Sequence, residues 1–174
     1  MSDDRARFEA MFRGHYDAIV RYVVRRLGRS AAGDVVSETF LIAWRRLDDV
    51  PENALPWLYA TARNLIANEI RRQQRDLALD RRLSAQPGAP ATDLGELVAE
   101  RLAVTSALQH LSERDREVLR LVHWEGLAVA DAAKVLGCTQ SAFKVRLHRA
   151  RRRLAGTAAP LLAEPEVNEL GALS

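Results

Sequence analysis

The residues best suited to chemistry stand near the end of the chain, in the basic run His148–Arg153. Guanidinium groups form paired hydrogen bonds with phosphates and with the O6 and N7 atoms of guanine. Before this run come a short predicted helix over residues 128–136, a tight turn at Gly137-Cys138, and Thr139, which can cap the next helix. This order is typical of a helix-turn-helix, whose second helix enters the DNA major groove.

The predicted second helix has one apolar face and one polar face. Phe143, Leu147 and Leu154 recur at helical spacing and are expected in the core. Lys144 and Arg149 can donate to guanine, whereas basic groups beside them are better placed for phosphates, which fix register without reading sequence. A solvated, arginine-rich helix end is the alternative reading. The residues expected to bind DNA are Gln140, Ser141, Lys144, Val145, Arg146, His148, Arg149 and Arg152.

Other chemistries find little support in the sequence. The four histidines fall on different predicted helices or helix ends, and no HxxxH, HExxH, GxxxxGK[ST] or GxGxxG pattern occurs. The single cysteine, Cys138, leaves no disulfide within the chain and no cysteine-based zinc site. We therefore expect no catalytic residues, no metal and no cofactor. Cys138 is interpreted as a small, partly buried residue, with a redox role as the alternative.

Charge is distributed unevenly along the 174 residues, although the net charge is only +3. Residues 101–155 carry 11 basic and 5 acidic side chains, and residues 156–174 carry 3 acidic and no basic ones. A basic segment of this kind favours a polyanionic partner. No apolar run approaches the roughly 20 residues of a membrane span, and the charged N-terminus does not resemble a signal peptide. We expect a cytoplasmic protein without membrane insertion.

Apolar spacing predicts an all-α protein, and no stretch alternates as a strand would. Asp34 is expected to cap the second helix and Ser112 the first helix after the linker. Two small helical domains are expected, joined by a flexible Pro- and Gly-containing linker whose first residues can extend the preceding helix. The expected helices cover residues 5–28, 34–47, 54–72, about 93–110, 113–124, 128–136 and 140–154; the expected units are a domain over 1–73, a linker over 74–99, a helix-turn-helix domain over 100–155 and an acidic tail over 156–174.

Two separated blocks together resemble an extracytoplasmic-function (ECF) RNA polymerase sigma factor. DVVSETFLIAWRRL followed by PWLYATARNLIANEIRRQQR resembles the promoter-melting domain, region 2, and LSERDREVLRLVHWEGLAVADAAKVLG followed by KVRLHRARRRL resembles the promoter-reading domain, region 4. With the N-terminal helix they cover roughly residues 7–72 and 100–154. The resemblance implies a subunit that binds core RNA polymerase and directs promoter-specific transcription initiation, with no catalysis of its own.

The resemblance also implies roles for residues of the first domain. A loop after the second helix would capture a base flipped from the −10 element, and unstacking that base costs a few kcal/mol. Trp57 and Tyr59 could stack on bases, although a core aromatic is the favoured reading of Trp57. The residues expected at the polymerase β′ clamp helices are Asp34, Ser37, Glu38, Leu41 and Arg45, and those expected at the −10 element are Glu52, Asn53, Asn64, Asn68, Arg71 and Arg72.

For the second domain the resemblance implies reading of the −35 element and a contact with the polymerase β flap. Core RNA polymerase and promoter DNA are thus the expected partners, and an anti-sigma factor is a further candidate, since many family members are held inactive by one. Val145 stands where a small polar residue is usual, Ala142 where threonine is usual, and Ser37 where glutamine is frequent. The departures at Val145 and Ala142 suggest a somewhat different −35 preference or fewer hydrogen bonds to DNA, and the departure at Ser37 affects the expected clamp contact.

Two other functions fit parts of the sequence. A stand-alone DNA-binding regulator would bind its duplex tightly without polymerase, and an anti-sigma-like decoy would bind polymerase without promoter DNA. Asp34 and Glu38 could also serve only the start of their helix, where negative charge is favourable. A pull-down of core polymerase with and without DNA separates the three functions.

Overall fold

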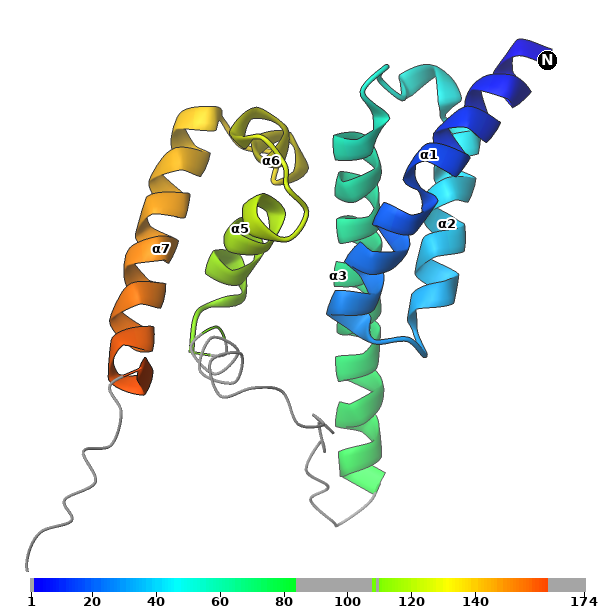
Figure 1. The fold of residues 1–174 in the computed structure, drawn as a ribbon. Helices are drawn as coiled ribbons and strands as arrows, with labels where there is room; N and C mark the ends of the chain where they lie inside the picture. The colour runs from blue at the N-terminus through cyan, green and yellow to red at the C-terminus, as the bar shows by residue number, and fades with distance from the viewer. Residues whose placement is uncertain (1, 84–107, 109, 163–174) are drawn as a thin grey trace, which may run out of the picture.

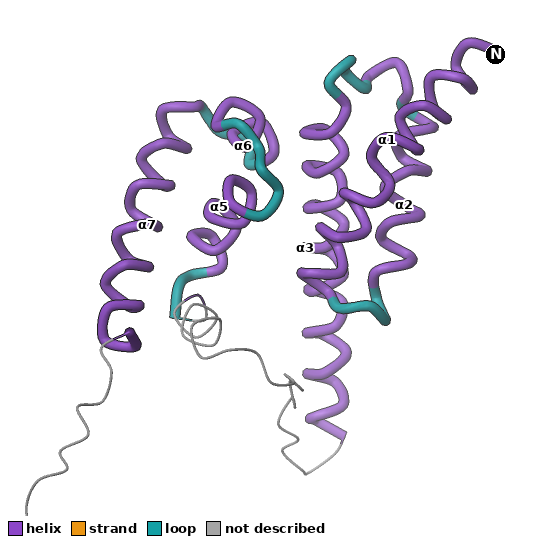
Figure 2. The backbone as a smooth tube through the Cα atoms, in the orientation of Figure 1, coloured by secondary structure: helices purple, strands orange, loops and turns teal. Residues whose placement is uncertain are grey.

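Every regular element in the described part of the chain is a helix (Figures 1 and 2). The computed structural model describes residues 2–83, 108 and 110–162, and the helical spacing predicted up to about residue 110 lies almost wholly outside them. The all-α prediction is confirmed for these residues. The elements are α1 (Ser2–Leu27), α2 (Ala32–Arg45), the 3-10 helix η1 (Leu47–Asp49), α3 (Ala54–Leu83), α5 (Glu113–His123), α6 (Val129–Val135) and α7 (Gln140–Leu162).

The first domain is a bundle in which α1, α2 and α3 pack against one another. Apolar side chains at helical spacing explain this arrangement, because each helix contributes one stripe to a common core. α1 ends at Gly28, whose positive φ of 77° is a conformation that favours glycine. The fully buried core residues are Ile19, Tyr22 and Val23 of α1, Ala43 of α2, and Leu58 and Ala62 of α3.

The second domain contains the predicted helix-turn-helix. The hydroxyl oxygen of Ser112 accepts the N–H of Asp115 at 3.2 Å, and that of Thr139 accepts the N–H of Ala142 at 3.2 Å, so both predicted caps are confirmed. The turns before α6 and α7 contain Gly126 and Gly137, which both have positive φ values. The core is formed by Leu121 of α5, Ala132 of α6, and Phe143 and Ala150 of α7, all 0% exposed.

The start of α2 differs from the prediction. The helix begins at Ala32, and its cap residue Ala31 makes no side-chain capping hydrogen bond. Asp34 therefore lies inside the first turn and is not the cap. Alanine favours the helical conformation, and this extends the helix upstream of the polar residue. The carboxylate still lies near the positive end of the helix dipole.

The large aromatic side chains differ widely in burial. Tyr22 is fully buried: its ring lies 4.7 Å from that of Tyr59 of α3, and its hydroxyl donates to Glu117 of α5. Trp44 and Trp124, by contrast, are 45% and 47% exposed. Single-helix periodicity does not show which side of a helix a second domain will cover.

Two helices continue past the predicted domain boundaries. α3 runs through the first part of the predicted linker to Leu83, over a sequence rich in helix formers and without glycine or proline. α7 continues through Gly156 into the predicted tail and ends at Leu162. Residues 163–174 of the expected acidic tail lie outside the described residues.

The two domains meet where α6 packs against α3. α2 lies on the side of the first domain away from α5, α6 and α7 (Figure 1). This arrangement leaves the outer face of α2 open, and it brings the start of α3 close to the helix-turn-helix.

Candidate nucleic-acid and polymerase interfaces

The outer face of α7 presents the side chains predicted to bind DNA. Phe143 and Leu147 face the core, which turns the opposite side of the helix to solvent. Val145 is 50% exposed and lies among these polar and basic side chains. The structure thus brings the predicted −35 residues to exposed positions on one helix: Gln140, Ser141, Lys144, Val145, Arg146, His148, Arg149 and Arg152.

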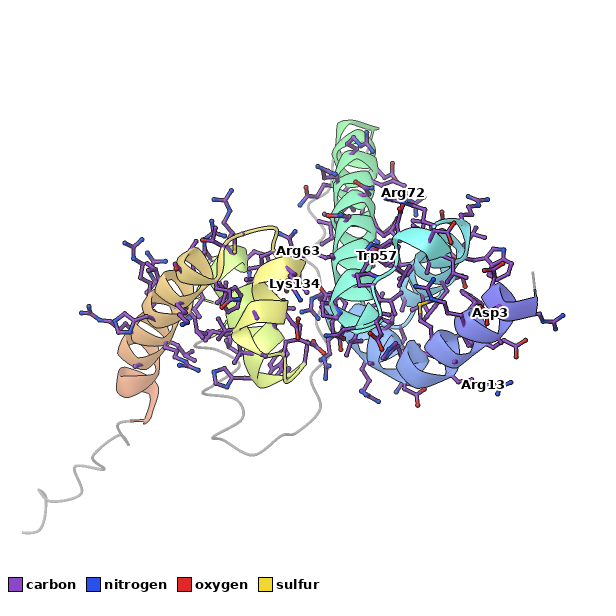
Figure 3. The ribbon with its side chains drawn as sticks, turned by 90° about the horizontal axis from the view of Figure 1, so that it is seen from above. Asp3, Arg13, Trp57, Arg63, Arg72 and Lys134 are labelled. Atoms are coloured by element: carbon purple, nitrogen blue, oxygen red, sulfur yellow. The ribbon has the colours of Figure 1, made fainter. Side chains whose placement is uncertain are left out.

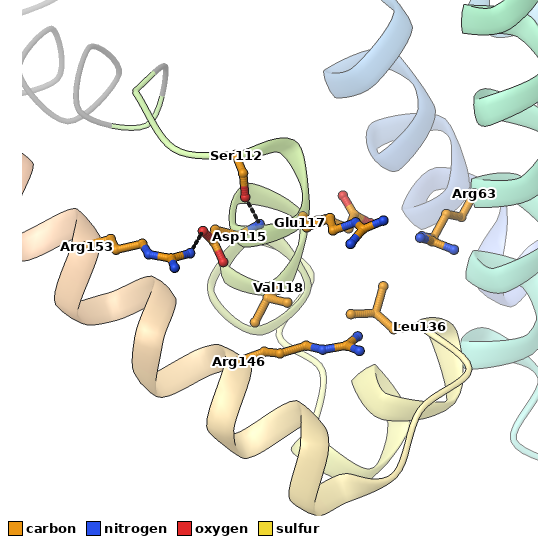
Figure 4. A pocket seen from close by; sticks show the side chains of 9 residues that line it. Arg63, Ser112, Asp115, Glu117, Val118, Leu136, Arg146 and Arg153 are labelled. Carbon is orange, nitrogen blue, oxygen red and sulfur yellow. Dashed lines mark hydrogen bonds and ion pairs between the residues drawn. The ribbon is translucent and has the colours of Figure 1, made fainter.

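Not every arginine of α7 extends away from the domain. Arg153 donates to the Asp115 carboxylate at 2.5 Å, and Arg151 approaches His123 at 3.4 Å, so both contact α5. Arg146 lines a cavity of about 460 Å³, with Arg63 of α3 on its far side (Figure 4). The side chains most open to a base edge are therefore those on the same face as Val145.

The outer face of α2 collects the residues predicted to contact the polymerase clamp. Positions separated by three or four residues share one side of a helix, and these five follow that spacing. Leu41 is 39% exposed, and Glu38 is half-buried. The structure brings together Asp34, Ser37, Glu38, Leu41 and Arg45 as one surface.

An aromatic surface adjoins this face and was missed by sequence reasoning. The rings of Phe8 and Trp44 lie 5.1 Å apart between centroids, and those of Phe12 and Phe40 lie 4.7 Å apart, joining α1 to α2. Tyr16 is 41% exposed and continues the series. Spacing of four residues in Phe8, Phe12 and Tyr16 indicates a shared face, but the same spacing is typical of core residues. The sequence alone could not show that this face stays partly open.

The predicted −10 residues lie at the start and along the exposed surface of α3. Glu52 and Asn53 are exposed on the loop between η1 and α3, and the side-chain amide of Asn53 lies 3.5 Å from Asp131 of α6. Asn64 is exposed farther along the helix. Sequence reasoning missed Arg7, which donates to the carbonyl oxygen of Val50 at 2.5 Å and so ties this loop to α1.

The remaining −10 candidates are engaged with near neighbours on α3. Arg71 donates to the side-chain oxygen of Asn68 at 2.5 Å. Arg72 donates to both carboxylate oxygens of Glu69 at 2.9 Å, and this hydrogen bonding lowers the pKa of Glu69. Figure 3 shows Arg72 on the side of α3 away from the second domain. These exposed pairs are weak and can exchange for phosphate contacts.

Tyr59 cannot stack on a base in this structure because it is only 2% exposed. Burial, with a further contribution from Glu125, raises the pKa of its hydroxyl to about 12. The stacking prediction for Tyr59 is thus wrong. Trp57 is half-buried and packs against the core, as the favoured reading of that residue expects.

The described part of the chain contains neither a candidate metal site nor a candidate membrane span. No group of three or more potential metal ligands occurs there. None of the described helices has a stretch long and apolar enough to span a bilayer. Cys138 forms no disulfide with a described residue and is half-buried, as its small-residue interpretation expects.

Comparisons with known proteins agree with both halves of the structure. Residues 11–76 match the model of Sigma-70 region 2, and residues 101–154 match that of Sigma-70, region 4. The ECF RNA polymerase sigma factor SigL of Mycobacterium tuberculosis is 33% identical over 156 residues, which cover 87% of this chain and 88% of SigL.

Two solved complexes contain a chain of similar fold. The sigma factor RpoE of Bartonella quintana, bound to the anti-sigma factor NepR, has a TM-score of 0.65 and 25% identity over 87% of this chain and 96% of its own. CnrH, bound to the cytosolic domain of CnrY, has a TM-score of 0.61 and 26% identity over 88% of both chains. The helix-turn-helix, the region 2 bundle and these matches together identify the chain as a member of the ECF RNA polymerase sigma factors, which direct promoter-specific transcription initiation as specificity subunits and are not themselves enzymes.

Proposed function

We propose that the outer face of α2 binds the β′ clamp helices of core polymerase, while α3 and its preceding loop read the −10 element and α7 reads the −35 element. The observation that carries this assignment is the open polar and apolar face of α2, which stands on the opposite side of the first domain from the recognition helix. A stand-alone DNA reader has no use for a second, protein-docking surface of this kind.

In this proposal the two domains act as separate readers. The region 2 unit extends along α3 beyond residue 73, and the region 4 unit extends along α7 beyond residue 155. A chain with this role works where bacterial core polymerase works, in the cytoplasm. The similar sigma factor RpoE is bound to the anti-sigma factor NepR, which supports an anti-sigma factor as a further partner of this chain.

Val145 gives the −35 reader a distinctive preference. An aliphatic side chain that is 50% exposed on the base-facing surface favours contact with the 5-methyl group of thymine. Burying about one methyl group contributes roughly 0.8 kcal/mol, or about fourfold in affinity. Uracil lacks this methyl group, so replacing single −35 thymines by uracil should lower the affinity by this amount at one position. In Val145→Ala, the difference in affinity between the thymine and uracil sites should vanish. Equal affinity for all uracil-substituted sites would contradict the contact.

The clamp assignment is tested by Leu41→Glu. A carboxylate in an apolar contact must be desolvated without a partner, and we expect at least a tenfold loss in affinity for core polymerase. Leu77→Glu is the matched control, because Leu77 is an exposed leucine, at 55%, on the distal part of α3. Both variants should retain the helical circular dichroism of the parent. Equal retention of polymerase by the two variants in a pull-down would contradict the assignment.

A further inference from the structure

A cluster of buried charges joins the end of α1 to α5 and the turn after it. Arg26 donates through Nε and one terminal nitrogen to the two carboxylate oxygens of Glu117, at 3.0 and 3.1 Å. Its other terminal nitrogen donates to Glu125 at 3.1 Å and to the carbonyl oxygen of Tyr22 at 2.9 Å. Arg25 reaches the second oxygen of Glu125 at 2.6 Å. Two arginines of the first domain thus neutralise two glutamates of the second.

Most of the cluster is buried, although the Arg25 side chain is 34% exposed. The side chains of Arg26 and Glu125 are 5% and 2% exposed. The hydroxyl of Tyr22 donates to Glu117 at 2.9 Å, and the Arg26 guanidinium lies 3.5 Å from the centre of the Tyr22 ring. Burial lowers the pKa of Arg26, but neighbouring Tyr22, Glu117 and Glu125 more than offset this and raise it. The hydrogen bonds among Tyr22, Arg26, Glu117 and Glu125 therefore form only while the domains touch.

A buried ion pair of this kind gives specificity more than net stability. Desolvating the charges consumes most of their mutual attraction, whereas removing one partner leaves an unpaired buried charge. The two domains are therefore held in one arrangement by contacts that water can replace once they separate. This makes the closed arrangement both well defined and reversible.

The closed arrangement is too short to read a bipartite promoter. Asn53, on the −10 loop, lies 3.5 Å from Asp131, and the chain advances only nine residues from Asp131 to Gln140 at the start of the recognition helix. Nine fully extended residues span at most about 32 Å. The −10 and −35 elements are by their names about 25 base pairs apart, or about 85 Å at about 3.4 Å per base pair. In the closed chain, the −10 loop and the start of the recognition helix are therefore much too close together to lie on two elements at that spacing.

We propose that Arg25, Arg26, Glu117 and Glu125 form an intramolecular lock that keeps the free chain closed and must open before both promoter elements are bound. The clamp face of α2 lies away from the lock and stays open in the closed chain. Polymerase can therefore capture the closed protein first. The apparent promoter affinity is then reduced by the fraction of chains that are open.

The lock is tested on the free, full-length chain by small-angle X-ray scattering. Glu117→Gln preserves the shape of the side chain but removes its charge, and it should shift the closing equilibrium by on the order of a hundredfold or more toward separated domains. The radius of gyration should rise in Glu117→Gln and in Arg26→Gln. It should rise no further in the double variant, because the two residues act on the same contact. Glu113→Gln is the matched control, since that carboxylate on α5 pairs, among the described residues, with Arg116 and Arg120 of its own domain.

Glu125→Gln repeats the test at a residue outside a helix, because a substitution within α5 can impair folding. Circular dichroism shows whether each variant is folded. A radius of gyration in folded Glu117→Gln and Glu125→Gln equal to that of the parent would overturn the proposal, as would a parent that is already extended. The lock bears on promoters only if the proposed function holds, but this measurement needs neither polymerase nor promoter. If the chain does not bind core polymerase, the proposed function is refuted. The scattering measurement still tests the lock independently.

Discussion

Replacing Arg149 by alanine should weaken promoter binding in a way that depends on one base pair of the −35 element. Arg149 is exposed, lies one helical turn after Val145, and precedes the buried Ala150. No hydrogen bond or ion pair of its side chain occurs within the described residues. Its guanidinium is thus free to form a paired contact with guanine.

The size of the effect follows from this contact. Losing a paired base contact costs about 1–3 kcal/mol, which corresponds to roughly 5- to 150-fold in affinity. Folding should be unaffected, because alanine favours the helix and surface substitutions of this kind change stability by less than about 0.5 kcal/mol. The loss should therefore appear in binding with no change in thermal unfolding.

The assay is competition between promoter fragments that differ at single −35 positions, with core polymerase present and at several salt concentrations. Arg149→Ala should lose discrimination at one position. Arg151→Ala is the matched control: it removes the same charge from the same helix, but its side chain turns toward His123. A residue that only neutralises phosphate weakens all sequences alike and reduces the salt slope by about 1. If Arg149→Ala behaves in that uniform way, the base contact is refuted.

Two further substitutions test the core of the second domain, at Phe143, and a buried ring of the first domain, at Tyr59. Phe143→Ala should destabilise the second domain by about 3–5 kcal/mol, because the ring is 0% exposed. Its melting temperature should fall sharply, whereas Val145→Ala, on the exposed face, should leave the melting temperature unchanged. Equal melting temperatures of the two variants would contradict the assignment of Phe143 to the core. Tyr59 has a pKa raised from the ordinary value of about 10 to about 12, so its neutral form is favoured by folding; that contribution is complete below about pH 10 and is lost as pH rises through 12. Urea unfolding at stepped alkaline pH should show a shallower loss of stability in Tyr59→Phe than in the parent, and identical slopes would count against the shift.

Local signals predicted much of the second domain. Ser112 and Thr139 were identifiable as caps because a hydroxyl before a helical stripe can accept a free N–H group within the first turn. Gly126 and Gly137 marked turns, and both adopt positive φ. Caps and turns are contacts between residues only a few positions apart, so the neighbouring sequence is enough to predict them. The start of α2 was misplaced because alanine before Asp34 extends the helix without a polar signal.

The contact between the domains could not be predicted in the same way. Arg26 and Glu117 are 91 residues apart, and each by itself is typical of a solvated helix surface. Tyr22 likewise gave no sign that a second domain would bury it. The predicted DNA and clamp residues could be placed because helical periodicity determines which of them share a face. Whether they touch DNA or polymerase stays a prediction.

Reconstituted transcription tests the central claim most directly. Core polymerase from a bacterium is mixed with the purified chain and a library of promoter fragments, and the 5′ ends of the transcripts are mapped. The proposed function predicts new start sites that share one −10 and one −35 sequence, and that disappear with Leu41→Glu but persist with Leu77→Glu. Start sites identical to those of core polymerase alone, or a chain that binds duplex DNA specifically without polymerase, would contradict it.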